Sequence, residues 1–195
     1  MTARLAVVTS NPHKAKEVAA FFKGEPEVEH VNLECPEFRH SDVGEIARGK
    51  AQFAWEQLAR PLIVDDTAFS VTALKGFPGP YAAYVLDTLG YRGILTLLEG
   101  VEERDASFET AIAYADGEGI LVFRGRIDGT ITRSPRGRDG FGYDPIFEVN
   151  GKTLAEIPLA EKSRISHRAR ALRAFGEWWR RERSHQIPAQ EGFHR

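Results

Sequence analysis

The spacing of apolar residues near the N-terminus predicts a strand followed by a helix. Residues 5–9 form a short apolar run that is typical of a buried strand. Asn11 then stands where a helix N-cap is expected, with Pro12 at the first helical position and Gly24 placed to end the helix. The apolar residues in between recur at helical spacing, namely Ala15, Val18, Ala19 and Phe22.

A second helix is predicted over residues 42–58, where Asp42 and Glu45 have the spacing of a capping box. One face carries an apolar stripe, formed by Val43, Ile46, Ala47, Ala51, Ala54 and Leu58. Lys50 falls on that same face. Its ammonium therefore either snorkels out to solvent or points into a polar cleft.

The segment LIVDDTAFSV, residues 62–71, sets an apolar run against two acids. Residues 62–64 read as a strand covered on both faces, which would present Asp65 and Asp66 at its carboxyl end. Ligands of open α/β sheets bind at that edge. The alternative is that one aspartate caps a turn and the other is solvated.

Further along, residues 73–85 have the Gly and Pro density of a shaped loop, and residues 87–100 become helical in their second half. Residues 107–131 contain two strand-like runs joined by a Gly-rich turn, which predicts a hairpin. Residues 133–147 form a second loop, rich in Gly and Arg. Helices mixed with a hairpin favour an α/β fold with a mixed sheet.

The last predicted helix starts at about Ser166 and carries an apolar stripe before a polar tail. We expect a single domain over residues 1–183 and a flexible tail over residues 184–195. Trp178 and Trp179 are adjacent, so both are not expected to face one helical stripe. One of them is therefore a candidate for a subunit interface.

Composition narrows the possible classes. The chain has 195 residues with 42% hydrophobic content, enough for one substantial core, and a formal net charge of −2 argues against nucleic-acid binding by overall charge. The single cysteine, Cys35, rules out an intrachain disulfide and is compatible with the cytoplasm. No apolar run near the N-terminus is long enough for a signal peptide or a membrane span.

Common catalytic signatures are absent. NGKT at residues 150–153 lacks the upstream glycine of a phosphate-binding loop, and no HExxH, CxxC or GxSxG motif occurs. What remains is a scattered set of charges suited to phosphate and magnesium: Lys14, Lys50, Lys162 and Arg168 as cations, with Glu37, Asp65 and Asp66 as acids. Lys14 falls in the first turn of its helix, where a lysine is either a surface residue or part of an anion site.

A series of motifs in the same order resembles the inosine triphosphate pyrophosphatase family over nearly the whole chain. The motifs are TSNPHK (9–14), PE (36–37), VDDT (64–67), GFPGPY (76–81), FRGR (123–126), GFGYDPIF (140–147) and EKSRISHRARAL (161–172). The resemblance implies a mixed twisted sheet flanked by helices, with two lobes around a nucleotide cleft. It also implies a homodimer and a cytoplasmic enzyme that hydrolyses ITP, dITP and XTP to the monophosphate and pyrophosphate.

The site residues follow from this resemblance motif by motif. It implies Mg²⁺ held by Glu37 and Asp66, with Asp66 or a metal-bound hydroxide activating water. It implies substrate contacts from Thr9, Ser10, Asn11, Lys14, Lys50, Asp65, Thr67, Phe141, Gly142, Tyr143, Asp144, Lys162, Ser166, His167 and Arg168. Ala82 and Ala83 depart from the family pattern, since some members have a basic residue there, which places one phosphate contact in doubt.

Two alternatives stay open at this point. One is a Maf-like pyrophosphatase that acts on other modified nucleotides, although the SHR motif at residues 166–168 favours purines. The other is a nucleic-acid binder that uses the basic stretch 162–183, although an amphipathic helix with solvated arginines accounts for that stretch more simply.

Overall fold

The computed structural model describes residues 4–24 and 26–185, and the eight strands found there form one mixed sheet in the order β2-β1-β3-β5-β6-β7-β8, with β4 paired to β3. β1 is parallel to β2 and β3, and the other pairs are antiparallel. The strands are β1 (Leu5–Val8), β2 (Val28–Val31), β3 (Leu62–Val71), β4 (Pro78–Gly79), β5 (Asp105–Asp116), β6 (Gly119–Ile131), β7 (Phe147–Val149) and β8 (Lys152–Thr153).

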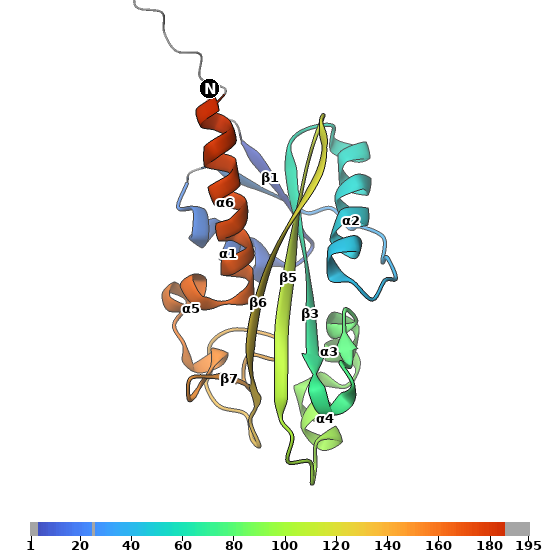
Figure 1. The fold of residues 1–195 in the computed structure, drawn as a ribbon, viewed down its shortest axis with the longest axis vertical. Helices are drawn as coiled ribbons and strands as arrows, with labels where there is room; N and C mark the ends of the chain where they lie inside the picture. Colours follow the sequence, from blue (N-terminus) through green and yellow to red (C-terminus); the bar gives the residue numbers. More distant parts are fainter. Residues whose placement is uncertain (1–3, 25, 186–195) are drawn as a thin grey trace, which may run out of the picture.

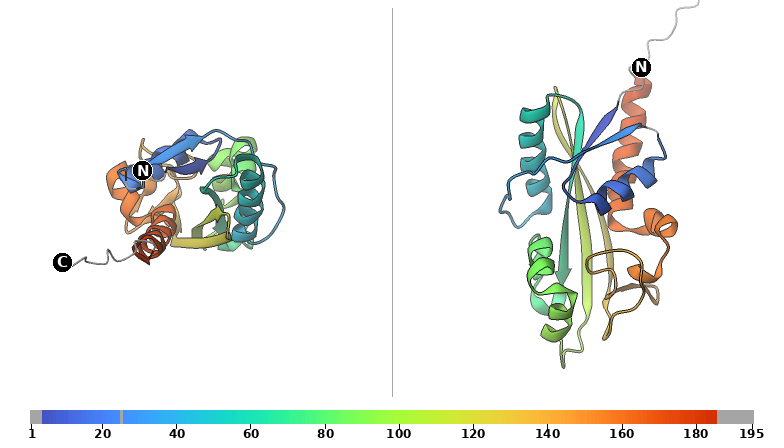
Figure 2. Two further views of the ribbon diagram at one scale, coloured as in Figure 1. Left: turned by 90° about the horizontal axis from the view of Figure 1, so that it is seen from above. Right: turned by 180° about the vertical axis from the view of Figure 1, so that it is seen from behind.

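Helices cover both faces of this sheet, which confirms the α/β class (Figure 1). They are α1 (Pro12–Phe22), α2 (Val43–Leu58), α3 (Ala82–Thr88), α4 (Gly90–Leu97), α5 (Leu159–Ile165) and α6 (His167–His185), with two short 3₁₀ helices, Thr72–Leu74 and Leu154–Glu156. In Figure 2 the two longest helices, α2 and α6, lie on opposite sides of the long strands. No helix in the described ranges is long and apolar enough to cross a membrane.

The side chains of β5 alternate between the two faces of the sheet, so this strand contributes to two hydrophobic cores. Ala111, Ala113 and Ala115 pack toward α2, whereas Ile112 and Tyr114 pack toward α1 and α6. Small residues under α2 let that helix lie close to the sheet, and larger ones fill the space under α6. The lower half of the molecule has a third core of its own, built around Phe69, Phe108, Tyr143, Ile146 and Phe147. The long strands β3, β5 and β6 pass through both halves, which form the two lobes (Figure 1).

The caps of the first two helices agree with the sequence. Asn11 Oδ1 accepts from the backbone N–H of His13 and Lys14, at 2.9 and 3.4 Å, so α1 starts where Asn-Pro predicted. Asp42 caps α2 through Gly44 N at 2.6 Å. The Glu45 carboxylate lies 3.7 Å from Arg48 instead of reaching back to the cap.

The strand expected to end at residue 64 continues through both aspartates to Val71. β5 pairs with it along all of this length, from Leu62 opposite Ala115 to Val71 opposite Ala106, so the backbone of the acidic pair remains hydrogen-bonded in the sheet. On its other edge, β3 pairs with β1 only as far as Val64. The two aspartates therefore lie where β1 ends and β3 loses one neighbour, which opens a space beside them.

Two further expectations were wrong in part, and two elements were not predicted. Residues from Ala82 onward form helix α3 within the predicted loop, and strand β2 and helix α5 were not predicted. The last helix starts at His167 and runs to His185, two residues into the expected tail, and residues 186–195 lie outside the described part of the chain.

Trp178 and Trp179 both pack on the core beneath α6, contrary to the expectation that only one could. Their rings lie 5.1 and 5.6 Å from the ring of Tyr114, and Phe175 contacts both. The aromatic patch on β5 and β6 is wide enough to take both indoles, because Phe123 extends it beside Trp178. Trp179 is buried and Trp178 is half-buried on this core.

Candidate functional site

A cleft of about 320 Å³ lies between the two lobes, beside the two aspartates. Its walls come from the β1–α1 turn, α2, the middle of β3, the loop before β7 and the α5–α6 junction. All but one of the residues implied by the resemblance line it. The exception is Ser166, whose buried hydroxyl accepts from Ala169 N at 3.1 Å and so caps α6 behind the cleft.

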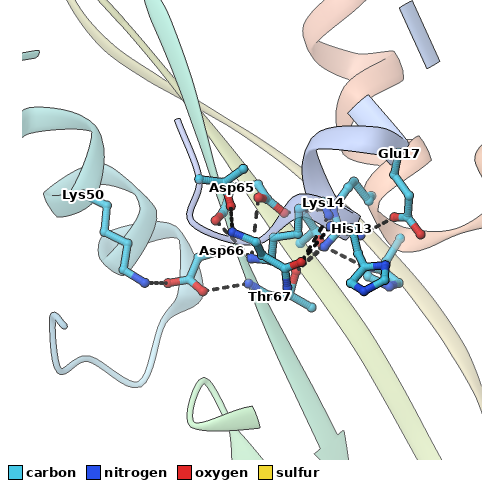
Figure 3. A network of polar contacts seen from close by, with 12 residues as sticks. His13, Lys14, Glu17, Lys50, Asp65, Asp66 and Thr67 are labelled. Carbon is cyan, nitrogen blue, oxygen red and sulfur yellow. Dashed lines mark hydrogen bonds and ion pairs between the residues drawn. The ribbon is translucent and has the colours of Figure 1, made fainter. Parts of the chain in front are cut away.

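An outer cluster of three charges, Glu37, Lys50 and Asp66, stands at one end of the cleft. The Lys50 ammonium lies 3.1 Å from Asp66 Oδ2 and 3.7 Å from Glu37 Oε2, so it points into the cleft rather than out to solvent (Figure 3). Burial alone would lower the pKa of Lys50, but the Asp66 and Glu37 carboxylates raise it, so Lys50 is charged. Asp66 Oδ1 also accepts from Thr67 N at 2.9 Å, which orients this carboxylate.

An inner cluster of six charges lies deeper, and its acids and bases alternate. The contacts run Lys14–Asp65 at 3.5 Å, Asp65–Arg168 at 2.8 Å, Arg168–Glu17, Glu17–Lys162 at 2.8 Å and Lys162–Asp144 at 2.7 Å. Figure 3 shows Lys14 and Glu17 reaching this cluster from α1, on the side of β3 opposite Lys50. The outer and inner clusters therefore lie on opposite sides of strand β3.

Electrostatics in the inner cluster follows from burial and pairing. Burial alone would raise the pKa of Asp65, yet Lys14 and Arg168 hold it at about 2. The same balance raises the pKa of Arg168, through Asp65 and Glu17. For Asp144 burial prevails over Lys162, and its pKa is raised.

His167 is a buried neutral imidazole. Burial, and then the charges of Arg168 and Lys162, hold its pKa well below the ordinary value. Its Nδ1 lies 2.6 Å from Thr110 Oγ1, which in turn lies 2.8 Å from Thr67 Oγ1. The ring stacks on Phe108 at 4.7 Å, so His167 acts as part of the wall behind Arg168.

Close packing against the backbone of β6 fixes the position of the start of α6. Gly125 on β6 lies against this helix, and a Cβ there would be 2.2 Å from the His167 carbonyl oxygen. The loop before β7 depends on another glycine, since Gly140 adopts a φ of 79° and a Cβ there would be 2.3 Å from Asp144 Oδ2. That same oxygen accepts from Phe141 N at 2.8 Å and so holds the Phe141 ring at the cleft.

The aromatic residues of that loop differ in position. The Lys162 ammonium lies 4.7 Å from the centre of the Phe141 ring, which also lines the cleft. Tyr143 belongs mainly to the lower core, because it stacks on Phe69 at 4.3 Å and its hydroxyl donates to Ala82 O at 2.7 Å. Of these two aromatic residues, Phe141 is thus the one whose ring belongs to the cleft rather than to the lower core.

Sequence reasoning missed two residues that shape the inner end. Glu17 is 6% exposed and pairs with two cations, and its one signal in the sequence is its position one helical turn after Lys14. His13 stacks on Phe141 with ring centres 5.1 Å apart, although 128 residues separate the two in the sequence. Nothing in the local pattern signals the His13 contact.

Comparisons with known proteins identify the family of the chain. The model of the Ham1 family matches residues 5–178. The chain is 48% identical to a dITP/XTP pyrophosphatase of Thermococcus kodakarensis, over 90% of this chain and 96% of that one. It is 41% identical to an inosine triphosphate pyrophosphatase of Aspergillus fumigatus, over 91% and 95%. A solved HAM1 protein structure from Coxiella burnetii superposes with a TM-score of 0.81 at 30% identity, covering 92% of this chain and 99% of that one.

Proposed function

Since the chain belongs to the Ham1 family, we propose that it hydrolyses the non-standard purine nucleotides ITP, dITP and XTP to the monophosphate and pyrophosphate. The observation that carries this proposal is the division of one cleft into two charged ends. The outer cluster offers carboxylates and an ammonium, which suit a triphosphate with its metal ion. The inner end offers a phenyl ring and buried N–H donors, which suit an oxygen-bearing purine base.

Arg168 is the donor that we assign to the base. Its guanidinium has five N–H groups, and three are directed to Asp65 Oδ2, Glu17 Oε2 and Thr67 Oγ1. Two N–H groups are left, one on each terminal nitrogen. Hypoxanthine and xanthine carry an acceptor oxygen at position 6, whereas adenine carries a donor amino group that would leave these N–H groups unpaired.

The outer cluster fits a magnesium ion. Glu37 and Asp66 both approach the Lys50 ammonium, so their carboxylates face one point that already suits a cation. Within the described part of the chain no group of three or more His, Cys, Asp or Glu residues is placed to hold a metal, so water and phosphate oxygens would complete the shell. When bound there, the ion would supply positive charge that stabilises the charge developing on the phosphates.

Side chains of the protein would carry out the remaining steps of binding and proton transfer. We assign Asp66 as the group that takes the proton of the attacking water, because it is oriented by Thr67 N at the open end of the cleft. The charged Lys50 lies beside it and would neutralise phosphate charge. Asn11 and Lys14, at the start of α1, line the cleft and would contact the phosphates through the Asn11 amide and the Lys14 ammonium.

A product assay tests the proposed reaction. The purified protein is incubated with ITP, XTP, dITP, GTP and ATP with Mg²⁺, and pyrophosphate and orthophosphate are measured separately. We expect pyrophosphate and the monophosphate from ITP, dITP and XTP, with ATP turned over far more slowly. Release of orthophosphate, or equal rates for ATP and ITP, would contradict the proposal.

The metal assignment has a readout that does not need turnover. Mn²⁺ is a spectroscopic substitute for Mg²⁺, and its binding can be followed by electron paramagnetic resonance with a non-hydrolysable ITP analogue. Glu37→Gln should weaken Mn²⁺ binding, whereas Glu45→Gln, at an acid that pairs with Arg48 on α2 and does not line the cleft, should leave it unchanged. Equal Mn²⁺ affinity in both variants would remove Glu37 from the metal site.

The two alternatives from the sequence have less support. The relatives named above are dITP/XTP and inosine triphosphate pyrophosphatases, which favours purine substrates over a Maf-like specificity. Of the cations in the stretch 162–183, Lys162 and Arg168 are buried in ion pairs, and Arg170 donates to Arg126 O at 2.8 Å. A salt titration of DNA binding tests the nucleic-acid alternative, because a backbone binder has a steep salt slope.

We further propose a homodimer that acts in the cytoplasm. Support for the dimer is the cluster of exposed aromatic residues next to the cleft, where Phe77, Tyr81 and Tyr84 are 41%, 49% and 70% exposed. Sedimentation analysis of the wild type and of Tyr84→Ser tests it. A wild type that sediments as a monomer at micromolar concentration would contradict the dimer. Fractionation of cells that produce the protein tests the location.

A further inference from the structure

Glu17 lies behind the wall of the cleft rather than in it. It is on α1 and 6% exposed, and it does not line the 320 Å³ cleft. It borders a separate space of only about 10 Å³ together with Phe21, Ser166 and Leu172. A nucleotide in the cleft would therefore touch Lys162 and Arg168 but not Glu17.

This carboxylate is nonetheless the link between the two cations that face the base. Glu17 Oε1 accepts from Lys162 Nζ at 2.8 Å, and Glu17 Oε2 accepts from Arg168 Nη1. Burial alone would raise the pKa of Glu17, but Arg168 and Lys162 lower it, so the carboxylate is ionised. Lys162 and Arg168 are both only 3% exposed in their side chains, so neither can relax into bulk water.

The position of the Arg168 plane depends on two acids. Asp65 holds Nε at 2.8 Å from one side, and Glu17 holds Nη1 from the other. Without Glu17 the guanidinium would keep Asp65 at Nε and only the longer, uncharged contact from Nη2 to Thr67 Oγ1 at 3.3 Å, so the charge-assisted bond that fixes its Nη1 end would be lost. Without Glu17, Lys162 and Arg168 would also repel each other in a medium of low dielectric constant.

We propose that Glu17 is a positioning residue for base selectivity, which fixes Arg168, with Lys162 beside it, so that the free N–H groups of Arg168 meet an oxygen at position 6 of the purine. This inference rests on the proposed function. It assigns selectivity in part to a residue outside the cleft, on the helix whose first turn meets the phosphates. The helix α1 then connects phosphate binding at Lys14 with base recognition one turn later.

The test compares Glu17→Gln and Glu17→Asp with the wild type, by kcat/KM for ITP and ATP and by Tm. Glu17→Gln keeps the shape but removes the charge, so kcat/KM for ITP should fall by about 10- to 100-fold, with little change for ATP. The ratio of kcat/KM for ITP to kcat/KM for ATP should therefore fall by nearly the same factor. Glu17→Asp keeps the charge on a shorter side chain and should restore part of the ratio.

The control is Glu29→Gln, which also removes a carboxylate paired with an arginine, Arg60 at 2.8 Å, but on β2 away from the cleft. It should leave the ratio unchanged. If the role of Glu17 is purely structural, Glu17→Gln will lower Tm and will change kcat/KM for ITP and for ATP by the same factor. An unchanged ratio of kcat/KM for ITP to kcat/KM for ATP in Glu17→Gln would overturn the proposal. If Glu17→Gln does not fold, Glu17→Asp decides, since a wild-type ratio in that folded variant contradicts the need for precise placement.

Failure of this inference is distinct from failure of the proposed function. If the wild type shows no preference for ITP over ATP, the proposed function itself is wrong and so is the selectivity it assigns to Glu17. If the wild type shows the preference and both Glu17 variants keep it, only the role of Glu17 is wrong.

Discussion

The two ends of the cleft differ in how complete they are before any ligand binds. In the inner cluster the side chains of Lys162 and Arg168 are each 3% exposed and bind two carboxylates apiece. In the outer cluster the Glu37 side chain is 89% exposed and its one cation, Lys50, is 3.7 Å away. The inner end is fixed by the fold, whereas at the outer end Lys50 holds Asp66 at 3.1 Å but Glu37 is open and only loosely paired.

This difference indicates that the two ends of the cleft have different roles. A buried, fully paired cluster cannot reorganise cheaply, so it can discriminate between bases by rigid hydrogen-bond geometry. The exposed Glu37 carboxylate, together with Asp66 at the edge of the cleft, can accept a hydrated ion and a flexible triphosphate, because the partner of Glu37 is easily exchanged. The adjacent residues Asp65 and Asp66 belong to different ends, and substitutions there should separate stability from catalysis.

The largest effect is expected at the outer end. Asp66→Asn removes a carboxylate that we assign to both metal binding and proton transfer, so kcat for ITP should fall by about 10³-fold. Tm should change little, because Asn can still accept from Thr67 N. Steady-state kinetics and thermal unfolding of one preparation check this, and a variant with near-wild-type kcat would remove Asp66 from the reaction.

The neighbouring substitution should act mainly on stability. Asp65→Asn leaves the buried Arg168 and Lys14 short of a counter-charge, at a cost of about 3 kcal/mol, or a fall in Tm of roughly 6–12 °C. Thermal unfolding at neutral pH measures this. A variant as stable as the wild type would show that the inner cluster does not depend on its charge balance.

A smaller effect concerns acidification at the inner end. The folded pKa of His167 lies well below the ordinary value of 6.5, so the unfolded chain takes up a proton that the folded chain refuses. This contribution to stability is present above pH 6.5 and is lost as pH falls below it, by about 1 kcal/mol between pH 7 and 5.5. His167→Asn should have a flatter dependence of unfolding free energy on pH in that range. Parallel curves for wild type and variant would contradict a neutral His167.

The smallest effect is expected where the inner end meets α1. His13→Ala removes the ring that stacks on Phe141 and should raise KM for ITP by roughly two- to tenfold, with kcat nearly unchanged. His13→Phe keeps the stack and should behave as the wild type. A KM that is equally affected by both substitutions would show that the stacked ring is not what matters.

Much of the outer end could be predicted from the sequence, because its signals are local. Asn11 and Pro12 mark the start of α1, and the position of Lys50 on an apolar face already raised the possibility of a cleft. The acidic pair was placed correctly beside an open space, although for a different reason than expected. The strand continues through Asp65 and Asp66, and it is β1 that ends.

The inner end could not be predicted in this way, because its contacts join residues far apart in the chain. Glu17 meets Arg168 across 151 residues and Lys162 across 145, and no local periodicity encodes either contact. Tyr143 lines the cleft, as expected, but its ring also stacks on Phe69 in the lower core, which no pattern indicated. Both facts follow from tertiary packing between segments that are far apart in the chain, and a local sequence pattern does not encode such packing.

The account rests on an inner end that recognises the base without metal and without a triphosphate. The most direct measurement is titration calorimetry of the wild type with inosine monophosphate and adenosine monophosphate in excess EDTA. The account predicts that inosine monophosphate binds at least about tenfold more tightly than adenosine monophosphate, because the N–H groups of Arg168 are already in place. Equal affinities, or a preference that develops only after Mg²⁺ is added, would contradict it.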